Sequence, residues 1–177
     1  MNIMKTITKC LNEWNATIEA LGQGEQTILI RKYATTLNEF LLYPTVSYAN
    51  KDDYLDSFDK KHRKFARKNT LPEKQDEKYL VKYYATVEDV IKKSNSRIGT
   101  LKDYHIWTKK HVKSYLENKP GQIWLLRVYK LENPQYLSRT RGMVYANVEK
   151  EVSLNNIEPV VTDKKYNKIK KEIINKK

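Results

Sequence analysis

The segment Ile123–Leu131, with the sequence IWLLRVYKL, limits the possible folds more than any other part of the chain. Its aliphatic, aromatic and β-branched residues favour a β-strand, which Asn133 and Pro134 should end. The nearly continuous apolar run at its start is typical of a strand that is buried on both faces. Such a strand needs neighbours in a sheet and other elements that cover the sheet, so the segment favours a fold that combines helices with strands.

Apolar spacing and turn residues predict the remaining elements. Further strands are expected at Thr27–Lys32, Phe40–Tyr43, Lys78–Val87 and Val144–Val148. Helices are expected at Thr8–Leu21, Asp52–Lys68, Glu88–Lys93, Thr100–Leu116 and Thr162–Lys176. Thr100 and Asp103 match a capping box. Pro44 should end the strand before it, and that strand is expected to pair with the strand at 27–32 as a hairpin.

Together these elements predict a single α+β domain over residues 1–160, followed by a basic C-terminal helix or tail at 161–177. The domain is expected to hold a curved mixed or antiparallel sheet, or a small barrel, flanked by about three main helices. A PUA-like barrel fits this description by analogy. The single Cys10 excludes a disulfide within the chain, and Met1–Lys9 lacks the apolar core of a signal peptide. We therefore expect a soluble, cytoplasmic protein.

Positive charge is concentrated in particular segments, which points to an anionic partner. The chain has 34 basic and 21 acidic side chains, for a net charge of +13, and Lys60–Lys68 holds six cations and no acid. Clustered cations attract polyanions because binding releases counterions, so we favour nucleic acid. The alternative is a basic surface without a ligand, since 27 of the 34 cations are lysine and lysine-rich codon usage gives the same excess. The predicted basic patch comprises Lys60, Lys61, Arg63, Lys64, Arg67 and Lys68.

Two arginines, Arg31 and Arg127, lie in strands that look buried. A buried guanidinium needs a carboxylate, carbonyl groups, water or a ligand phosphate. Glu13, Glu19 or helix-end carbonyls could satisfy either arginine, and Glu19 is favoured for Arg31 because Glu13 suits the first turn of the predicted helix. Alternatively, both arginines face one polar cleft beside aromatic rings that stack on bases. The candidate nucleic-acid-binding residues are therefore Arg31, Lys32, Tyr43, Trp107, Lys109, Lys110, Arg127 and Tyr129.

Motifs for catalysis are weak in this sequence. His62, His105 and His111 do not pair at helical spacing, and one cysteine cannot complete a site, so no metal site is predicted. A metal-dependent nuclease that uses Mg²⁺ is an alternative, because Asp76 and Lys78 join an acid to a lysine at the start of a strand. Chance explains this pair better in so charged a chain, so no catalytic residue and no cofactor are assigned. A further alternative is a module that binds an acidic protein partner.

Several segments, in the order in which they occur, resemble a known family. LNEWNATIEALGQGEQTILIRK, EFLLYPT and KPGQIWLLRVYKLENP are similar to the pattern of the prokaryotic family domain of unknown function 1802, from about Leu11 to Val148. The histidine that follows Pro-Thr in that family and its Gly-Cys-x-Ser-Trp element are missing here. Members of the family occur beside restriction-endonuclease-like domains. The resemblance therefore implies a restriction–modification or defence setting and DNA rather than RNA as the partner, without implying an activity.

Overall fold

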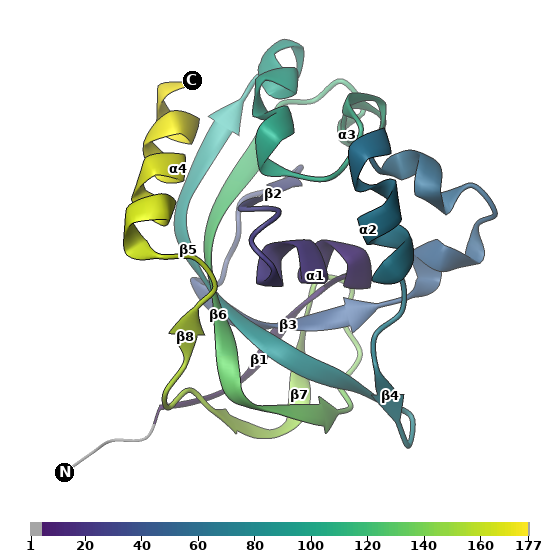
Figure 1. Cartoon of the computed structure of the whole chain (residues 1–177), viewed down its shortest axis with the longest axis vertical. Helices are drawn as coiled ribbons and strands as arrows, with labels where there is room; N and C mark the ends of the chain where they lie inside the picture. Colours follow the sequence, from purple (N-terminus) through teal and green to yellow (C-terminus); the bar gives the residue numbers. More distant parts are fainter. Residues whose placement is uncertain (1–4, 177) are drawn as a thin grey trace.

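An eight-stranded mixed sheet is the framework of the computed structural model, which describes residues 5–176 (Figure 1). Residues 1–4 and Lys177 lie outside the described part. The prediction about a signal peptide in Met1–Lys9 and the prediction of a basic tail at 161–177 therefore fall partly on residues that the structure does not describe. The strands are β1 (Thr6–Trp14), β2 (Ile28–Arg31), β3 (Glu39–Thr45), β4 (Lys74–Gln75), β5 (Lys78–Lys93), β6 (Gly121–Leu137), β7 (Tyr145–Ser153) and β8 (Glu158–Pro159). Their main order is β2-β6-β5-β3-β1-β7, with β4 beside β5 and β8 beside β6. β1 and β3 run parallel and the other pairs run antiparallel, so the predicted α+β class with a mixed sheet is confirmed.

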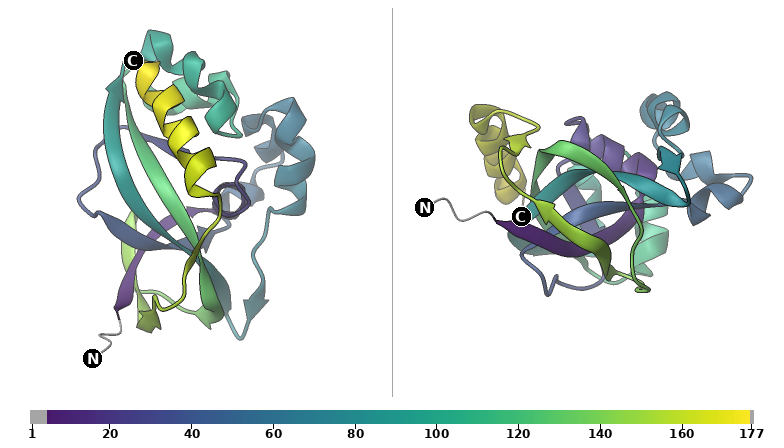
Figure 2. Two further views of the ribbon diagram at one scale, coloured as in Figure 1. Left: turned by 60° about the vertical axis from the view of Figure 1, so that its left-hand side comes forward. Right: turned by 90° about the horizontal axis from the view of Figure 1, so that it is seen from below.

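The two longest strands, β5 and β6, bend this sheet (Figure 2). They pair antiparallel along most of their length, with two shifts in register, and such bulges increase the local twist. Beyond β6, Arg139 bridges Val148 of β7, and the backbone N–H of Thr140 donates to the Asn147 carbonyl at 2.8 Å. The sheet therefore curls until the far end of β6 reaches β7, as the prediction of a curved sheet requires.

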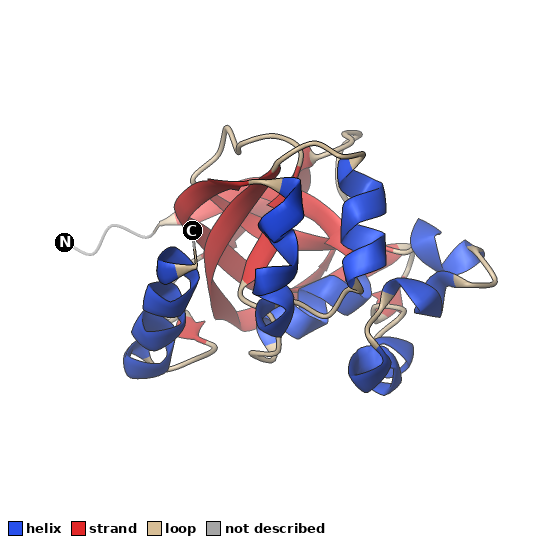
Figure 3. Ribbon diagram, turned by 90° about the horizontal axis from the view of Figure 1, so that it is seen from above, coloured by secondary structure: helices blue, strands red, loops and turns tan. Residues whose placement is uncertain are grey.

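Four α-helices and four 3-10 segments surround the sheet in the described residues. They are α1 (Asn15–Gly22), α2 (Arg63–Lys68), α3 (Lys109–Leu116), α4 (Asp163–Asn175), η1 (Ser47–Asn50), η2 (Tyr54–Ser57), η3 (Lys60–His62) and η4 (Asn95–Tyr104). Every residue of α1 is buried, and this helix packs against β3, β6 and α2. α4 lies beside β5, on the opposite side of the molecule from α2 (Figures 1 and 3). Its own residues Tyr166 and Ile173 are buried.

The helix predicted at Thr8–Leu21 is wrong in its first half. Residues Thr6–Trp14 form β1, and the helix covers only Asn15–Gly22. β1 pairs with β3 on one side and β7 on the other, so two ladders of hydrogen bonds outweigh the helical spacing of its apolar residues. As a consequence, Glu13 and Trp14 stand where a strand turns into a helix.

Sheet pairing also corrects four smaller predictions. The strands at 27–32 and 40–43 exist but form no hairpin, because β2 pairs with β6 and β3 lies between β1 and β5. Residues Glu88–Lys93 continue β5 instead of forming a helix, since their pairing with β6 runs on to Lys93. Pro44 lies inside β3, at a point where β5 no longer pairs with it and its missing N–H costs nothing. Pro134 lies inside β6 within a break in the ladder, for the same reason.

The bridge between Phe58 and Trp107 interrupts two predicted helices. Asp52–Lys68 forms η2, η3 and α2 in turn, because Phe58 leaves the helical path to bridge Trp107. Thr100–Leu116 forms the end of η4 and then α3. The hydroxyl of Thr108, instead of the predicted capping box, caps α3. The strand predicted at 144–148 is confirmed within β7, and no helix in residues 5–176 has the length and apolar character to cross a membrane.

Candidate functional site

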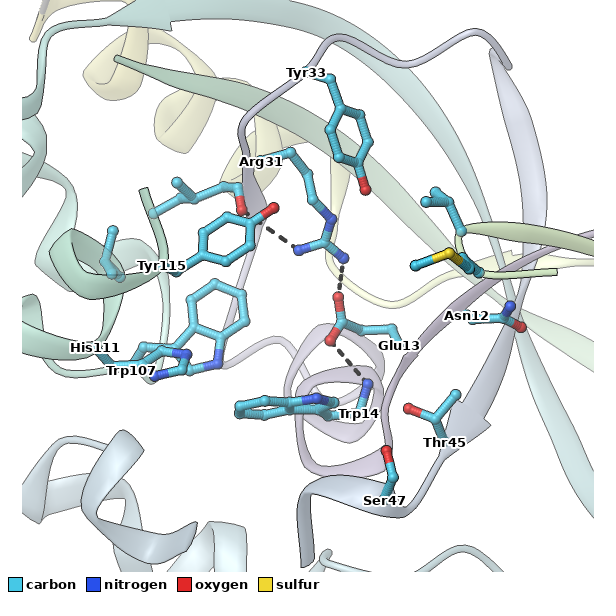
Figure 4. Close-up of a pocket in the computed structure, with 14 residues that line it drawn as sticks. Asn12, Glu13, Trp14, Arg31, Tyr33, Thr45, Ser47, Trp107, His111 and Tyr115 are labelled. Atoms are coloured by element: carbon cyan, nitrogen blue, oxygen red, sulfur yellow. Dashed lines mark hydrogen bonds and ion pairs between the residues drawn. The ribbon is translucent and has the colours of Figure 1, made fainter. Parts of the chain in front are cut away.

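A pocket of about 360 Å³ opens where β1 ends and α1 begins (Figure 4). Glu13 and Trp14 reach it from the end of β1, and Arg31 from the end of β2. His111 and Tyr115 line it from successive turns of α3. Three elements that are distant in sequence thus bring charged and aromatic groups to one cavity.

A buried ion pair between Glu13 and Arg31 forms one wall of the pocket. The two side chains are only 6% and 13% exposed, and the second carboxylate oxygen of Glu13 accepts the backbone N–H of Trp14 at 2.8 Å. Burial lowers the pKa of Arg31, but the Glu13 carboxylate more than offsets this and leaves that pKa above its usual value. Glu19, the expected partner, instead accepts the Tyr83 hydroxyl at 3.1 Å. Of the two acids considered for Arg31, Glu13 is therefore the partner and the favoured Glu19 is not, because Glu13 lies on a strand rather than in a helix.

Aromatic rings form much of the remaining wall. The indole of Trp14 stacks on Tyr48 with a centroid distance of 4.7 Å and an interplanar angle of 7°, so protein covers one of its faces. Tyr33 and Tyr115 stand on either side of the Arg31 guanidinium (Figure 4). Flat rings around a guanidinium favour a flat ligand, because stacking on π-faces and donation from the arginine act on the same group.

His111 lies between two tryptophans at the base of α3. Its ring centroid is 5.3 Å from that of Trp14 and 6.3 Å from that of Trp107, which also lines the pocket. Burial lowers the pKa of His111, and Lys51 lowers it further although Glu13 acts in the opposite direction. The imidazole is therefore neutral at neutral pH, and Arg31 and Glu13 are the charged groups that line the cavity.

Two basic segments meet beside this pocket. Phe58 bridges Trp107, with a backbone hydrogen bond of 2.9 Å on either side of the bridge, which joins the segment before η3 to the segment before α3. The exposed members of the predicted basic patch follow on η3 and α2, namely Lys60, Lys61, Lys64, Arg67 and Lys68. Arg63 is half-buried and lies 3.8 Å from Asp56. Lys109 and Lys110 are exposed in the first turn of α3.

Arg127 does not share the pocket with Arg31. In the register of β2 and β6, Arg31 lies opposite Gln122, and alternation along β6 then directs Arg127 to the other face of the sheet. There Arg127 pairs with Asp163 at 2.8 Å, and its guanidinium lies 4.5 Å from the ring centroid of Tyr166. The expectation that both arginines face one cleft is therefore wrong, and Arg127 holds α4 against the sheet.

Three other candidate residues also lie outside the pocket or at its edge. Tyr43 is buried and donates its hydroxyl to the Leu137 carbonyl at 2.7 Å. Tyr129 packs near Arg127, away from the cavity. Lys32 lies 5.1 Å from the ring centroid of Tyr115, at the margin of the pocket. Of the eight candidate residues, Arg31 and Trp107 line the cavity, Lys32 lies at its margin, and Lys109 and Lys110 precede His111 in the first turn of α3.

The acidic residue proposed for a nuclease serves a turn. Asp76 and Glu77 have φ angles of 51° and 64°, and the flanking Gln75 and Lys78 pair with each other, so the four residues form the tight turn between β4 and β5. Lys78 pairs with Glu149 at 2.8 Å. In residues 5–176, no three side chains among His, Cys, Asp and Glu gather as metal ligands would. The structure thus offers the nuclease alternative no supporting geometry in its described part.

Sequence analysis missed most of the residues that form the pocket. Trp14 and Tyr115 have the spacing of core residues on helices, which hides their exposure to a cavity. Tyr33 could have been predicted as a site residue, since it directly follows the candidate residues Arg31 and Lys32. Met143 could not have been predicted, because an isolated methionine in a weakly patterned loop has no distinctive chemistry.

Comparisons with known proteins give one family match and several distant structural similarities. The sequence pattern of the family described as domain of unknown function (DUF1802) matches residues 10–172. No curated protein matches this sequence. Among solved structures, ASCH from Zymomonas mobilis is similar with a TM-score of 0.44 and 11% identity, over 94% of this chain and 93% of that one. A serine-to-alanine variant of it gives a TM-score of 0.49 and 11% identity, over 84% and 92%. A tyrosine-to-phenylalanine variant gives 0.44 and 12%, over 73% and 72%, and nothing about the activity of this chain follows from such distant matches.

Proposed function

Because the chain belongs to the family domain of unknown function 1802, whose description names no activity, we propose its function from the pocket itself. The protein binds nucleic acid and takes one unstacked base into the cavity beside α3. The observation that carries the proposal is an arginine held among aromatic rings, in a pocket next to two exposed basic segments. The resemblance found in the sequence is confirmed for the family, and the ligand is our proposal.

The size and charge of the pocket favour a base over other small ligands. A cavity of about 360 Å³ lies near the lower limit for ligand pockets, which suits a single planar group. Glu13, the carboxylate that lines the pocket, is already paired with Arg31, so an aromatic cage for a cation is disfavoured. A base offers a π-face to Tyr33 and Tyr115 and acceptor atoms to the guanidinium.

The exposed cations supply the contacts to the nucleic-acid backbone. Lys60, Lys61 and Lys64 lie on one of the joined segments, and Lys109 and Lys110 on the other. Cations near a base pocket can hold the phosphates that flank the inserted nucleotide. In its finer form the proposal is DNA, in the restriction–modification or defence setting that the family resemblance implies.

The test compares a tyrosine that lines the pocket with a tyrosine that lies outside it. Tyr115 lines the pocket, whereas Tyr129 lies elsewhere on the sheet. Because stacking on one aromatic side chain is worth about 1–3 kcal/mol per base, Tyr115→Ala should weaken binding to a DNA oligonucleotide about tenfold or more, measured by fluorescence anisotropy. Tyr129→Ala should change the affinity less than about twofold, since its ring contacts no ligand. Equal losses in the two variants would contradict a base in this pocket.

Salt dependence and competition separate nucleic acid from an acidic protein partner. If about five phosphates are neutralised, the logarithm of the binding constant should fall with the logarithm of salt concentration at a slope of about −4 to −5. A flat response, or no binding in dilute buffer, would reject the proposal. DNA of defined sequence should compete more strongly than heparin of equal charge, because heparin has no base to insert. An RNA strand of the same sequence, if it binds as tightly, would reject the preference for DNA.

A further inference from the structure

Met143 is the most exposed large apolar side chain among the described residues, at 96%. It also lines the base pocket, so it stands at the mouth of the cavity. Tyr33, at 39%, is exposed at the same mouth, whereas Leu71, at 66%, lies in a loop that does not line the pocket. Water disfavours an exposed methionine, and a contact with another apolar surface would relieve that cost.

The backbone on both sides of Met143 is fixed in place. Asn12 of β1 donates its side-chain N–H to the Gly142 carbonyl at 2.9 Å, and its backbone N–H donates to the Val144 carbonyl at 2.9 Å. A Cβ atom at Gly142 would lie 2.0 Å from the Tyr145 carbonyl oxygen, so only glycine fits this close approach. Met143 is thus presented outward on a rigid turn instead of being carried by a loose loop.

The same loop carries positive charge. Arg139 and Arg141, both exposed, precede Met143 in the loop. The Arg139 guanidinium contacts the Thr140 carbonyl and lies 5.4 Å from the ring centroid of Tyr43, which leaves its charge uncompensated. An apolar side chain at the mouth of the pocket, with exposed arginines in the same loop, matches the chemistry of side chains that enter a base stack while arginines hold the phosphates.

We propose that Met143 is a wedge that enters the stack of a DNA duplex and fills the space left by the base that moves into the pocket. This inference rests on the proposed function and adds that the substrate is paired DNA. Extrusion of a base costs stacking and pairing energy, and an apolar side chain in the vacated position recovers part of that stacking. Apolar side chains of this kind enter the base stack of DNA from the minor groove and kink the duplex, so we place the turn of Met143 in that groove.

The experiment measures binding to a short fully paired DNA duplex, to the same duplex with one mismatch, and to one of its single strands. Met143→Ala should weaken binding to the paired duplex about tenfold, because the vacated space stays empty. The loss should shrink on the mismatched duplex, where extrusion already costs less, and disappear on the single strand. Met143→Leu should retain duplex binding. Leu71→Ala, the matched control, should bind all three DNAs as the wild type does.

Three outcomes would overturn the wedge alone. Equal losses on duplex and single strand, or an undiminished duplex affinity of Met143→Ala, would each remove it. Wild-type binding to single strands alone would also reject the wedge and leave the proposed function standing. If the wild type binds none of the three DNAs, the proposed function fails instead. Thermal unfolding should be the same in all variants, since both mutated side chains are exposed.

Discussion

At the scale of single residues, the ion pair of Glu13 and Arg31 combines two roles. It neutralises two charges in a nearly buried place, and it leaves a guanidinium beside the pocket. Removal of one partner of a buried pair leaves the other charge uncompensated, which costs more than the pair itself contributes. The stability of the fold and the chemistry of the site therefore depend on the same two side chains.

We expect Arg31→Met to lower the free energy of unfolding by about 3 kcal/mol, because the Glu13 carboxylate would stay buried without a partner. The double variant Glu13→Gln/Arg31→Met should recover much of that loss, since no charge then remains. Chemical denaturation of the wild type, both single variants and the double variant measures this coupling. Strictly additive losses would show that the two charges act independently.

Arg31→Lys should keep part of the stability but lose nucleic-acid affinity, because an ammonium cannot present the planar fork of a guanidinium.

At the scale of elements, sequence patterns identified the strands that bury most surface and failed where pairing partners decide the outcome. β6 was predictable because its apolar run is strong in any context. β1 was not, because residues with helical spacing formed a strand once β3 and β7 supplied partners on both sides. The wrong helix prediction for β1 also hid the pocket, because Trp14 on the apolar stripe of a helix would be expected to lie in the core and not in a cavity wall. Sequence analysis did select Arg31, which lines the pocket, because a cation at the end of a buried strand needs a partner in any fold.

The N-terminal cap of α3 holds in place the helical turn that carries His111 into the pocket wall. Thr108 accepts the backbone N–H of His111 at 3.0 Å, and His111 is itself a wall of the cavity. Thr108→Ala should lower the free energy of unfolding by about 1 kcal/mol and also weaken nucleic-acid binding, because the first turn of α3 frays. Thr162→Ala is the matched control, since Thr162 caps α4 in the same way with Lys165. It should cost similar stability in denaturant and leave binding unchanged. A Thr108→Ala protein that binds normally would show that the pocket does not need an ordered α3 start.

At the scale of the whole molecule, acid should destabilise the fold through its histidines. The pKa values of all three are lowered by burial, and that of His105 falls to about 4. In the unfolded chain a histidine has a pKa of about 6.5, so unfolding takes up protons between about pH 6.5 and 4 and stability falls as pH falls. His105 alone should remove about 3 kcal/mol over that range.

Chemical denaturation at pH 7.5 and at pH 5 measures the slope of the free energy of unfolding against pH. In His105→Asn the side-chain carbonyl can still accept the Trp107 backbone N–H, which His105 accepts at 3.1 Å, but it cannot titrate. The slope should therefore decrease in this variant while stability at pH 7.5 changes little. An unchanged slope would assign the acid sensitivity to other groups.

The parallel pairing of β1 with β3, and its antiparallel pairing with β7, have a consequence for synthesis on the ribosome. β1 is made before either partner, and the contact of Asn12 with Gly142 spans 130 residues. Contacts of such separation form late, because the intervening chain must first be ordered. A nascent chain that has not yet released Val144 from the exit tunnel lacks one side of the cavity. Until then the pocket in which we propose that a base binds is incomplete, however much of the basic surface has already emerged.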